Sequence, residues 1–348
     1  MLRKRKNEDI KDGFARGKSR ETKGNNMIRV EHLSKRYGSR YALDDVSFQI
    51  EKGEIVGLLG ANGAGKSTTM NILTGYLSAT EGSVYVDGIS VLDDPTEAKR
   101  RIGYLPEQPP LYFDMTVREY LEFVYELKGC TLARAAHLAD VMQAVKITDV
   151  ADRLIGQLSK GYRQRVGIAS ALVGDPPLLI FDEPTVGLDP KQIIEVRNLL
   201  RALGKNHTVV LSTHILSEVQ AVCERIVVIK EGHIVANERT EDITRRMERD
   251  GRYRVTVAGA PSKDIQAALG TLRDVRRVET LGGRDGEGYR FSIETRGGAD
   301  IRRALFSLCV ERGYTLLSSE QRGADLEDVF VRLMESGMTE EKQEKGRR

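Results

Sequence analysis

The sequence feature that most constrains the fold is the stretch from Gly60 to Thr68, which reads GANGAGKST. It follows an apolar run from Glu54 to Leu59, and a short run of this kind before a glycine-rich turn predicts a buried strand. The stretch matches the P-loop pattern G-x-x-x-x-G-K-[ST] in the strand–loop–helix setting that the pattern requires. Its glycines allow backbone N–H groups to turn toward phosphate oxygens at the N-terminus of a helix. The sequence therefore predicts an α/β fold that binds a nucleotide.

Two side chains of this loop have expected roles in binding the phosphates and the metal. We expect Lys66 to reach the β- and γ-phosphates and the Ser67 hydroxyl to ligate Mg²⁺. A chance occurrence of so short a pattern is the alternative interpretation, and the strand before it favours the nucleotide site. The predicted nucleotide-binding residues of the loop are Gly60, Ala61, Asn62, Gly63, Ala64, Gly65, Lys66, Ser67 and Thr68.

A second apolar segment, Leu178 to Phe181, ends in two carboxylates. The turn sequence Asp175-Pro176-Pro177 precedes it, so the segment predicts another buried strand. At the C-terminal end of that strand, Asp182 is placed to hold Mg²⁺ and Glu183 to polarise a water for attack on a γ-phosphate. A solvated strand end without function has the same sequence, and the P-loop upstream favours the catalytic interpretation.

Between these two segments the chain reads LSKGYRQR from Leu158 to Arg165, followed by an apolar pattern of helical period. This resembles the signature motif of the ATP-binding cassette (ABC) ATPases, usually Leu-Ser-Gly-Gly-Gln, with Lys160 and Tyr162 at the third and fifth positions. Ser159 still offers a hydroxyl, and Gly161 still allows the backbone to approach a phosphate at a helix start. The resemblance implies a P-loop NTPase cassette, with a RecA-like core and a helical subdomain, that uses ATP and Mg²⁺.

The remaining motifs of this family follow in order along the chain. Tyr37 matches the aromatic residue that stacks on adenine, although a turn tyrosine that packs on its own sheet is the simpler alternative. Gly187-Leu188-Asp189 resembles the D-loop that crosses between two cassettes, with Val186 where a small residue is usual. His214 follows a strand predicted over Thr208–Leu211 and matches the switch histidine that contacts the γ-phosphate and holds Glu183 and a water in place. A structural histidine after a strand is the alternative for His214.

The chain departs from the family pattern at the Q-loop, after Ile102-Gly103-Tyr104-Leu105-Pro106. Glu107, and not glutamine, stands at the position that contacts the metal in the family. Gln108 is the next residue, so the sequence leaves open which of the two reaches the metal.

Charge and composition narrow the function further. The 54 basic and 51 acidic residues nearly cancel, so we expect no nucleic-acid partner. The three cysteines, Cys130, Cys223 and Cys309, lie far apart without a C-x-x-C pattern, which argues against a zinc site or a disulfide framework and favours a reducing cytoplasm. No apolar stretch approaches the roughly 18 residues that span a membrane. We therefore expect any transport to use a separate membrane subunit.

The 348 residues suit two domains between two charged tails. We expect a disordered basic tail over residues 1–26, the ABC ATP-binding domain over 27–240, a C-terminal accessory domain over 241–335 and a charged tail over 336–348. Within the cassette, residues 114–157 are predicted to form a helical insert. Three aromatics beside the Q-loop, Tyr104, Tyr112 and Phe113, are either core residues or contacts to a membrane subunit.

After Thr240 the periodicity predicts the order β-α-β-β-α-β, a ferredoxin-like split unit. The strands are expected near Tyr253–Val257, Val275–Leu281, Tyr289–Ile293 and Tyr314–Ser318, and the helices near Ile265–Leu269 and Ile301–Arg312. The segment from Leu326 to Leu333 predicts an amphipathic closing helix. Many ABC ATPases that drive exporters resemble this arrangement, including its Leu-Glu-Asp-Val-Phe ending. We interpret the domain as regulatory or dimer-supporting.

The resemblance implies the ATP-hydrolysing subunit of an ABC transporter, with export favoured, that acts through a separate integral membrane permease. It also implies a second cassette as partner, in a homodimer or a heterodimer, and a place at the cytoplasmic face of the cell membrane. The transported cargo does not follow from the sequence.

A soluble ABC ATPase of translation or DNA repair is the alternative from another functional class. Translation factors of this superfamily usually carry two cassettes in one chain, and chromosome-maintenance members separate the P-loop from the signature by a long coiled coil. Here Lys66 and Ser159 are only 93 positions apart. Neither of these variants fits the sequence. A GTPase is disfavoured because no Asn-Lys-x-Asp motif occurs.

Overall fold

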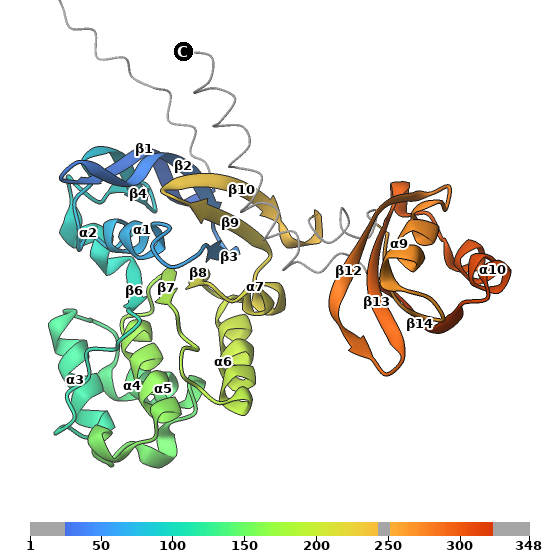
Figure 1. Ribbon diagram of the computed structural model, residues 1–348. Coiled ribbons are helices and arrows are strands. Elements are labelled where there is room, and N and C mark those ends of the chain that lie inside the picture. Colours follow the sequence, from blue (N-terminus) through green and yellow to red (C-terminus); the bar gives the residue numbers. More distant parts are fainter. Residues whose placement is uncertain (1–24, 243–250, 323–348) are drawn as a thin grey trace, which may run out of the picture.

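A six-stranded sheet runs through the middle of the cassette, in the order β10-β9-β3-β8-β7-β6 (Figure 1). The computed structural model describes residues 25–242 and 251–322. The strands from β9 to β6 are parallel, and β10 pairs antiparallel with β9 at one edge. The strand bounds are β3 Ile55–Leu59, β6 Ile102–Leu105, β7 Leu178–Asp182, β8 Thr208–Thr213, β9 Arg225–Lys230 and β10 His233–Arg239.

Both faces of this sheet are buried, which explains why its strands are continuously apolar. Alternate residues of a strand point to opposite faces. On β3, Val56 and Leu58 join the core shared with the antiparallel sheet and α1, whereas Ile55 and Leu59 join the core of the helical part. Strands buried on both faces are typical of parallel sheets covered by other layers. The predicted strands around Glu54–Leu59, Leu178–Glu183 and Thr208–Leu211 are confirmed.

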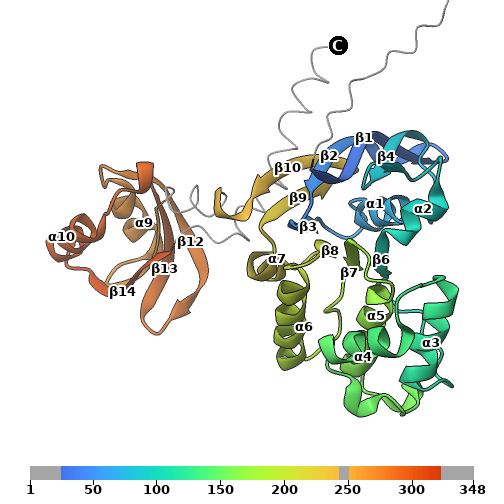
Figure 2. The ribbon, with the colours of Figure 1, turned by 180° about the vertical axis from the view of Figure 1, so that it is seen from behind.

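A second, antiparallel sheet has the strand order β2-β1-β4-β5. Helix α1 lies between this sheet and the six-stranded sheet (Figure 1). Figure 1 shows the antiparallel sheet at the top of the view, with the helices α3, α4 and α5 at the bottom, and Figure 2 shows the same layers from behind. Along β2, exposed and buried positions alternate, as expected for a sheet with one solvated face. The bounds are β1 Asn26–Tyr37, β2 Arg40–Glu51, β4 Glu81–Val86, β5 Ile89–Ser90 and α1 Lys66–Leu73.

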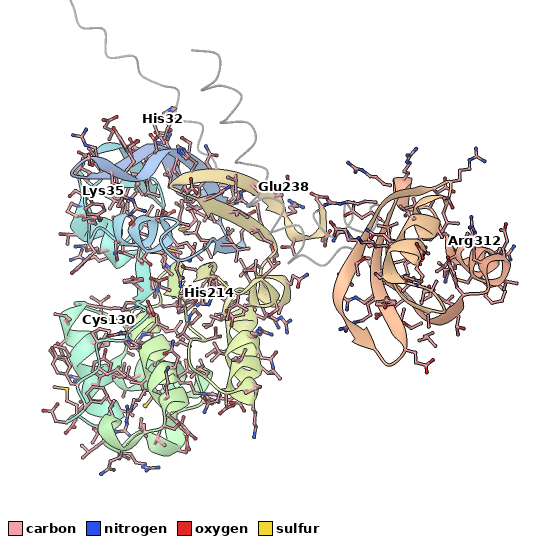
Figure 3. All side chains as sticks on the ribbon, in the orientation of Figure 1. His32, Lys35, Cys130, His214, Glu238 and Arg312 are labelled. Carbon is pink, nitrogen blue, oxygen red and sulfur yellow. The ribbon has the colours of Figure 1, made fainter. Side chains whose placement is uncertain are left out.

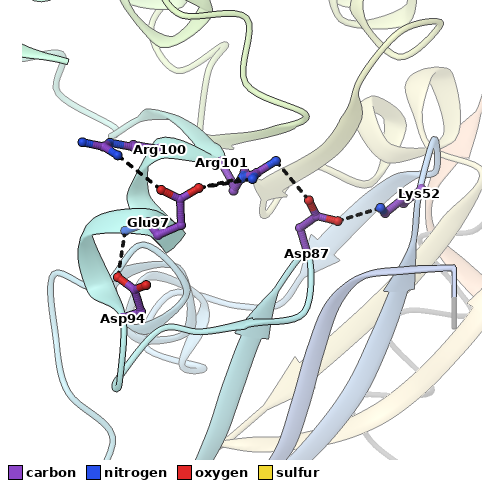
Figure 4. Close-up of polar contacts among 6 residues, drawn as sticks. All are labelled: Lys52, Asp87, Asp94, Glu97, Arg100 and Arg101. Atoms are coloured by element: carbon purple, nitrogen blue, oxygen red, sulfur yellow. Dashed lines mark hydrogen bonds and ion pairs between the residues drawn. The ribbon is translucent and has the colours of Figure 1, made fainter. Parts of the chain in front are cut away.

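Charged side chains link this antiparallel sheet to helix α2 (Pro95–Arg100), as Figure 4 shows. The Asp87 carboxylate, in the turn after β4, lies 2.6 Å from Lys52 Nζ and 3.4 Å from the Arg101 guanidinium. Arg101 also pairs with Glu97 at 3.2 Å, and the Asp94 carboxylate accepts the N–H of Glu97 as the N-cap of α2. These partly exposed pairs fix the orientation of α2 and contribute little to stability individually.

The helical insert contains α3 (Val117–Leu127) and α4 (Arg134–Ala144), with short 3-10 turns at Thr148–Val150 and Ile155–Gln157. Helix α3 begins with a capping box, in which Thr116 accepts the Glu119 N–H and the Glu119 carboxylate accepts the Thr116 N–H. The insert leads into α5 (Lys160–Leu172), the helix predicted after the signature motif. Two further helices, α6 (Pro190–Leu203) and α7 (Leu216–Val222), follow β7 and β8.

The C-terminal domain has its own core and its own four-stranded antiparallel sheet, in the order β12-β13-β11-β14. Its elements occur as β11 Arg252–Ala258, α9 Ser262–Gly270, β12 Val275–Asp285, β13 Gly288–Thr295, α10 Arg302–Arg312 and β14 Thr315–Arg322. Every strand and helix of the predicted β-α-β-β-α-β order is therefore present. The predicted closing helix, Leu326–Leu333, lies outside the described residues, as do residues 1–24 of the predicted N-terminal tail and the predicted tail at 336–348.

Within residues 25–242 and 251–322, no helix is both long and apolar enough to cross a membrane.

Candidate nucleotide-binding and catalytic site

The loops after β3, β6, β7 and β8 meet at one edge of the six-stranded sheet and line a cleft of about 450 Å³. The carboxyl ends of parallel strands meet at the same edge, which is where α/β proteins bind ligands. The cleft is lined by the P-loop from Asn62 to Thr68, except Ala64, and by Ala42, Glu107, Glu183, Val186 and His214. Figure 3 labels His214 in the middle of the cassette, between its sheets and its lower helices. The structure thus places together the residues of four separate predicted motifs.

The P-loop conformation depends on glycine at two positions. Gly65 has φ +115°, and a Cβ there would lie 2.7 Å from the carbonyl oxygen of Ala42. Gly60 passes so close to β9 that a Cβ would lie 2.4 Å from the carbonyl oxygen of Ile229. Gly65 is also the N-cap of α1 and carries no side-chain cap, so the first N–H groups of the helix are available to an anion.

Lys66 lies inside the cleft with only 6% of its surface exposed. Its ammonium donates to the carbonyls of Gly60, at 2.8 Å, and Ala61, at 3.2 Å, and lies 4.0 Å from the Glu183 carboxylate. Burial lowers the pKa of Lys66, and the charges of Glu183, Asp182 and Glu107 oppose this effect. The Lys66 Nζ lies where phosphate oxygens would enter the cleft.

Asp182 ends β7 and is 5% exposed. Its Oδ1 is buried and has no hydrogen-bond partner in the described part of the chain. Burial raises the pKa of Asp182, while the nearby Ser212 hydroxyl opposes the rise. A buried carboxylate oxygen without a partner is costly unless a ligand satisfies it, and hard oxygen donors are the ligands of Mg²⁺. Asp182, with the hydroxyl of Ser67 nearby, fits a magnesium ion.

Glu183 and His214 form a direct pair across the cleft. His214 Nδ1 lies 2.9 Å from Glu183 Oε1 and 3.0 Å from Oε2. The Glu183 side chain is 10% exposed and that of His214 45%, so the pair joins a buried carboxylate to a ring at the cleft surface. Glu183 also has φ +49°, a backbone conformation that is uncommon for residues other than glycine. Backbone strain of this kind occurs often at functional sites.

The structure places the two candidate Q-loop residues, Glu107 and Gln108, differently. Glu107 lines the cleft, and its charge acts on both Lys66 and Asp182. Gln108 is exposed and is not among the residues that line the cleft. Of the neighbouring aromatics, Tyr104 packs against the core and burial raises its pKa to about 12, whereas Tyr112 and Phe113 are 49% and 55% exposed. Tyr104 is therefore a core residue, and the other two lie on the surface.

Tyr37, at the end of β1, lines a neighbouring cavity of about 590 Å³. This cavity shares Ala42 and Gly63 with the P-loop cleft and is also lined by Arg40, Tyr41 and Glu231. Tyr37 is 53% exposed, and the Lys35 ammonium of the same strand lies 5.4 Å from the ring centroid. The geometry leaves the ring available for stacking beside the phosphate cleft.

The signature residues do not reach this cleft. Ser159 is exposed and caps α5 by accepting the N–H of Tyr162 at 3.4 Å. Gly161 is buried against α6, where a Cβ would lie 2.6 Å from the Gln192 side chain. Asp189 caps α6 by accepting the N–H of Gln192 at 2.9 Å. None of these three residues lines the P-loop cleft of its own chain.

Two cleft-lining residues, Ala42 and Val186, were not among the predicted site residues. Ala42 enters from β2, which precedes β3 in the chain but belongs to the separate antiparallel sheet, so only the fold brings it to the P-loop. No sequence signal marks such a residue, because it contributes backbone and shape and carries no reactive group.

Comparison with known proteins gives the family. A family model described as ABC transporter matches residues 43–186. The chain is 32% identical to the bacitracin transport ATP-binding protein BcrA of Bacillus licheniformis, over 89% of this chain and 98% of that one. It is 31% identical to the linearmycin resistance ATP-binding protein LnrL of Bacillus subtilis, over 88% and 98% of the two chains.

Among solved structures, the chain resembles the dimeric post-hydrolysis state of the ATP-binding cassette MJ0796 bound to ADP and Pi. The TM-score is 0.56 at 31% identity, and the match covers 62% of this chain and 99% of that one. The matched relatives thus cover the cassette and, for the two bacterial proteins, nearly the whole chain. From its cleft, its motifs and these relatives together, the chain belongs to the ATP-binding proteins of ABC transporters.

Proposed function

We propose that Glu183 is the residue that activates water for ATP hydrolysis in this ABC ATPase. The observation that carries this assignment is the position of the Glu183 carboxylate, 4.0 Å from the Lys66 ammonium and 2.9 Å from the His214 ring, within the P-loop cleft. A carboxylate in this position accepts a proton from a water directed at the γ-phosphate. Lys66 stabilises the charge on the transferred phosphate, and His214 holds the carboxylate and the water in place.

Binding of the nucleotide uses the rest of the cleft. The N–H groups of the P-loop residues that line the cleft, Asn62, Gly63 and residues 65–68, hold the phosphates at the start of α1. Gly60, Ala61 and Ala64 shape the loop without lining the cleft, and the Ala64 N–H donates to the Ala61 carbonyl at 3.1 Å. The adenine ring stacks on Tyr37. Ser67, Asp182 and Glu107 would hold Mg²⁺, because Asp182 has the unsatisfied buried oxygen and Glu107 faces the same cleft, with Gln108 outside it. Magnesium offsets the negative charge of the phosphates.

A second cassette completes the site. Ser159 and Gly161 do not line the cleft of their own chain, yet an exposed helix start with a serine N-cap suits a phosphate. In a head-to-tail dimer, Ser159 and Gly161 of each chain contact the ATP held by the other, and Asp189 lies at the crossing. The dimeric MJ0796 cassette supports this arrangement. Either a second copy of this chain or a different cassette serves as the partner.

A membrane permease is the second partner, with the cassette held at the cytoplasmic face of the cell membrane. Exposed aromatics beside the Q-loop form the proposed contact. The Tyr112 and Phe123 rings pack edge to face at 5.5 Å, and Phe113 follows Tyr112 in the chain. The Arg163 guanidinium of α5 stacks over the Phe113 ring at 5.1 Å, so this surface touches the signature helix directly. Movement at the permease contact is thereby passed to Ser159.

Export is the proposed direction of transport. The relatives that match nearly the whole chain include a bacitracin transport protein and a linearmycin resistance protein. A lantibiotic transport protein of Streptococcus pyogenes matches the cassette at 38% identity over 60% of this chain. These names favour a transporter over a role in translation or DNA repair.

Substitution of the carboxylate tests the assignment. Glu183→Gln keeps the shape of the side chain but removes the base, so turnover should fall by about two to four orders of magnitude while ATP still binds. Lys66→Ala should instead weaken ATP binding, measured by titration with a fluorescent ATP analogue. The exposed residue Lys205, just after α6 and outside the cleft, gives the matched control Lys205→Ala. Wild-type turnover in Glu183→Gln would show that the assignment is wrong.

A further inference from the structure

Behind the Glu183–His214 pair lies a buried carboxylate that no step above uses. Glu218, in the first turn of α7, is only 1% exposed. Its Oε1 accepts the hydroxyl of Thr185, and its Oε2 accepts the hydroxyl of Thr213 at 2.9 Å. Both hydroxyls are buried as well, at 3% and 0% exposure. A carboxylate this deeply buried is costly unless its hydrogen bonds are satisfied, so the two threonines determine where Glu218 can lie.

The two threonines belong to the two segments that carry the pair. Thr185 follows Glu183 by two residues, in the turn after β7, and Thr213 directly precedes His214 at the end of β8. Thr213 Oγ1 also accepts the N–H of Ile215 at 3.0 Å, so its hydroxyl spans the backbone on both sides of His214. The Glu218 carboxylate is thus hydrogen-bonded to one side chain from each of the two segments that carry Glu183 and His214.

The backbone conformation of Glu183 depends on support from its surroundings. At φ +49° Glu183 has a conformation that costs about 1 kcal/mol for an L-residue and persists only where the surroundings impose it. The Glu183 N–H donates to the Ser212 carbonyl at 2.9 Å, and the Glu183 carbonyl accepts the N–H of Val186 at 3.2 Å. These bonds hold the main chain, and the Thr185–Glu218 bond holds the turn that follows.

We infer that Glu218 is a positioning residue. Through Thr185 and Thr213 it keeps the Glu183 carboxylate and the His214 ring within hydrogen-bonding distance of each other. Glu218 does not line the cleft, so it acts through the pair and not on ATP. This inference rests on the proposed role of Glu183. A displacement of about 1 Å in a catalytic group can cost about 100-fold in rate, whereas the P-loop and the adenine cavity stay intact.

Turnover and nucleotide binding should therefore separate in the test. Glu218→Ala is expected to lower kcat by about 10- to 100-fold, with the KM for ATP and the number of ATP sites per chain unchanged. Glu218→Gln keeps one carbonyl acceptor for a hydroxyl, so its kcat should lie between those of the wild type and Glu218→Ala. Thr185→Val and Thr213→Val each remove one of the two bonds and should each lower kcat.

Double substitution shows whether these groups act as one unit. Once Glu218 is alanine, the hydroxyl of Thr185 has lost its acceptor. Adding Thr185→Val to Glu218→Ala should therefore cause little further loss of kcat, whereas independent effects would multiply. The threonine variants also keep the inference testable if Glu218→Ala does not fold.

Val219→Ala is the matched control, because Val219 is the next residue of α7, is 0% exposed and packs toward Gly57 of β3. It weakens the packing of the same helix without touching the hydroxyls. Its kcat per ATP-binding site should stay within about twofold of the wild type. Equal losses of kcat in Val219→Ala and Glu218→Ala would reduce Glu218 to a packing residue and overturn the inference.

The parallel Glu183→Gln variant separates this inference from the proposed function. If Glu183→Gln is inactive and Glu218→Ala turns over ATP like the wild type, only the positioning role is wrong. If Glu183→Gln itself keeps wild-type turnover, both are wrong.

Discussion

At the residue scale, the surroundings of His214 distinguish between a catalytic and a structural role for its imidazole. Its side chain is 45% exposed and bonds Glu183 from the surface of the cleft. A histidine that served mainly to fill the core would be buried and would contact apolar side chains. The position of His214 instead suits a residue that orients Glu183 and a water.

His214→Ala should accordingly lower ATP hydrolysis without lowering the melting temperature by more than a few degrees. Little buried surface is lost, because the ring is half-exposed, and surface substitutions typically change stability by about 0.5 kcal/mol or less. The measurement pairs a turnover assay with a thermal unfolding curve. A large fall in melting temperature, matched by a proportionate fall in activity, would favour the structural interpretation.

Which site residues the sequence could predict depends on how far each contact reaches along the chain. Lys66, Asp182, Glu183 and His214 were predictable because each stands in a local motif that ends or follows an apolar strand. The choice of Glu107 over Gln108 was not, since both follow the same strand and only the fold decides which faces the cleft. Glu218 could not be found either, because its partners lie far apart in sequence, in the turn after β7 and at the end of β8.

At the element scale, the C-terminal end of the signature helix α5 is held by a lysine from another helix. Lys128, the C-cap of α3, donates from Nζ to the carbonyls of Ser170 at 2.9 Å, Ala171 at 3.1 Å and Val173 at 2.8 Å. The last carbonyls of a helix lack partners within the helix, and a cation there also complements the helix dipole. Burial nevertheless lowers the pKa of Lys128 from 10.5 to about 8.

This lowered pKa predicts that the free energy of unfolding depends on pH. Between pH 8 and 10.5 the unfolded chain binds more protons at Lys128 than the folded chain, so the free energy of unfolding rises with pH. The contribution of Lys128 to the free energy of unfolding is complete above pH 10.5 and is lost as the pH falls through 8. Urea unfolding at several pH values should show the wild type gaining up to about 3 kcal/mol relative to Lys128→Met across this window. A difference that does not change with pH would contradict the prediction.

The elements themselves were predictable to different degrees. The apolar strands β3, β7 and β8 and the amphipathic helix α3 were clear because their periodicity is strong. The pairing of β1 with β2 and β4 into a separate antiparallel sheet did not follow from the sequence. Pairing depends on which strands meet in space, and the register of β1 and β2 shifts several times along their length.

At the scale of the whole molecule, the central claim is that two cassettes share each ATP. The cleft contains the P-loop, Glu183 and His214 of one chain, and Ser159 stands exposed at the start of α5 outside it. We propose that bound ATP joins the two cassettes, that hydrolysis releases them, and that closure of the dimer carries the permease contacts of the helical part toward each other.

Sedimentation of the hydrolysis-deficient Glu183→Gln variant, with and without ATP, tests this claim most directly. The variant should form a dimer only with ATP, and adding Ser159→Arg should abolish the dimer while ATP still binds the P-loop. Ser78→Arg, at an exposed serine outside the cleft, is the matched control and should dimerise normally. A monomer under all conditions, also with a candidate partner cassette present, would contradict the shared site.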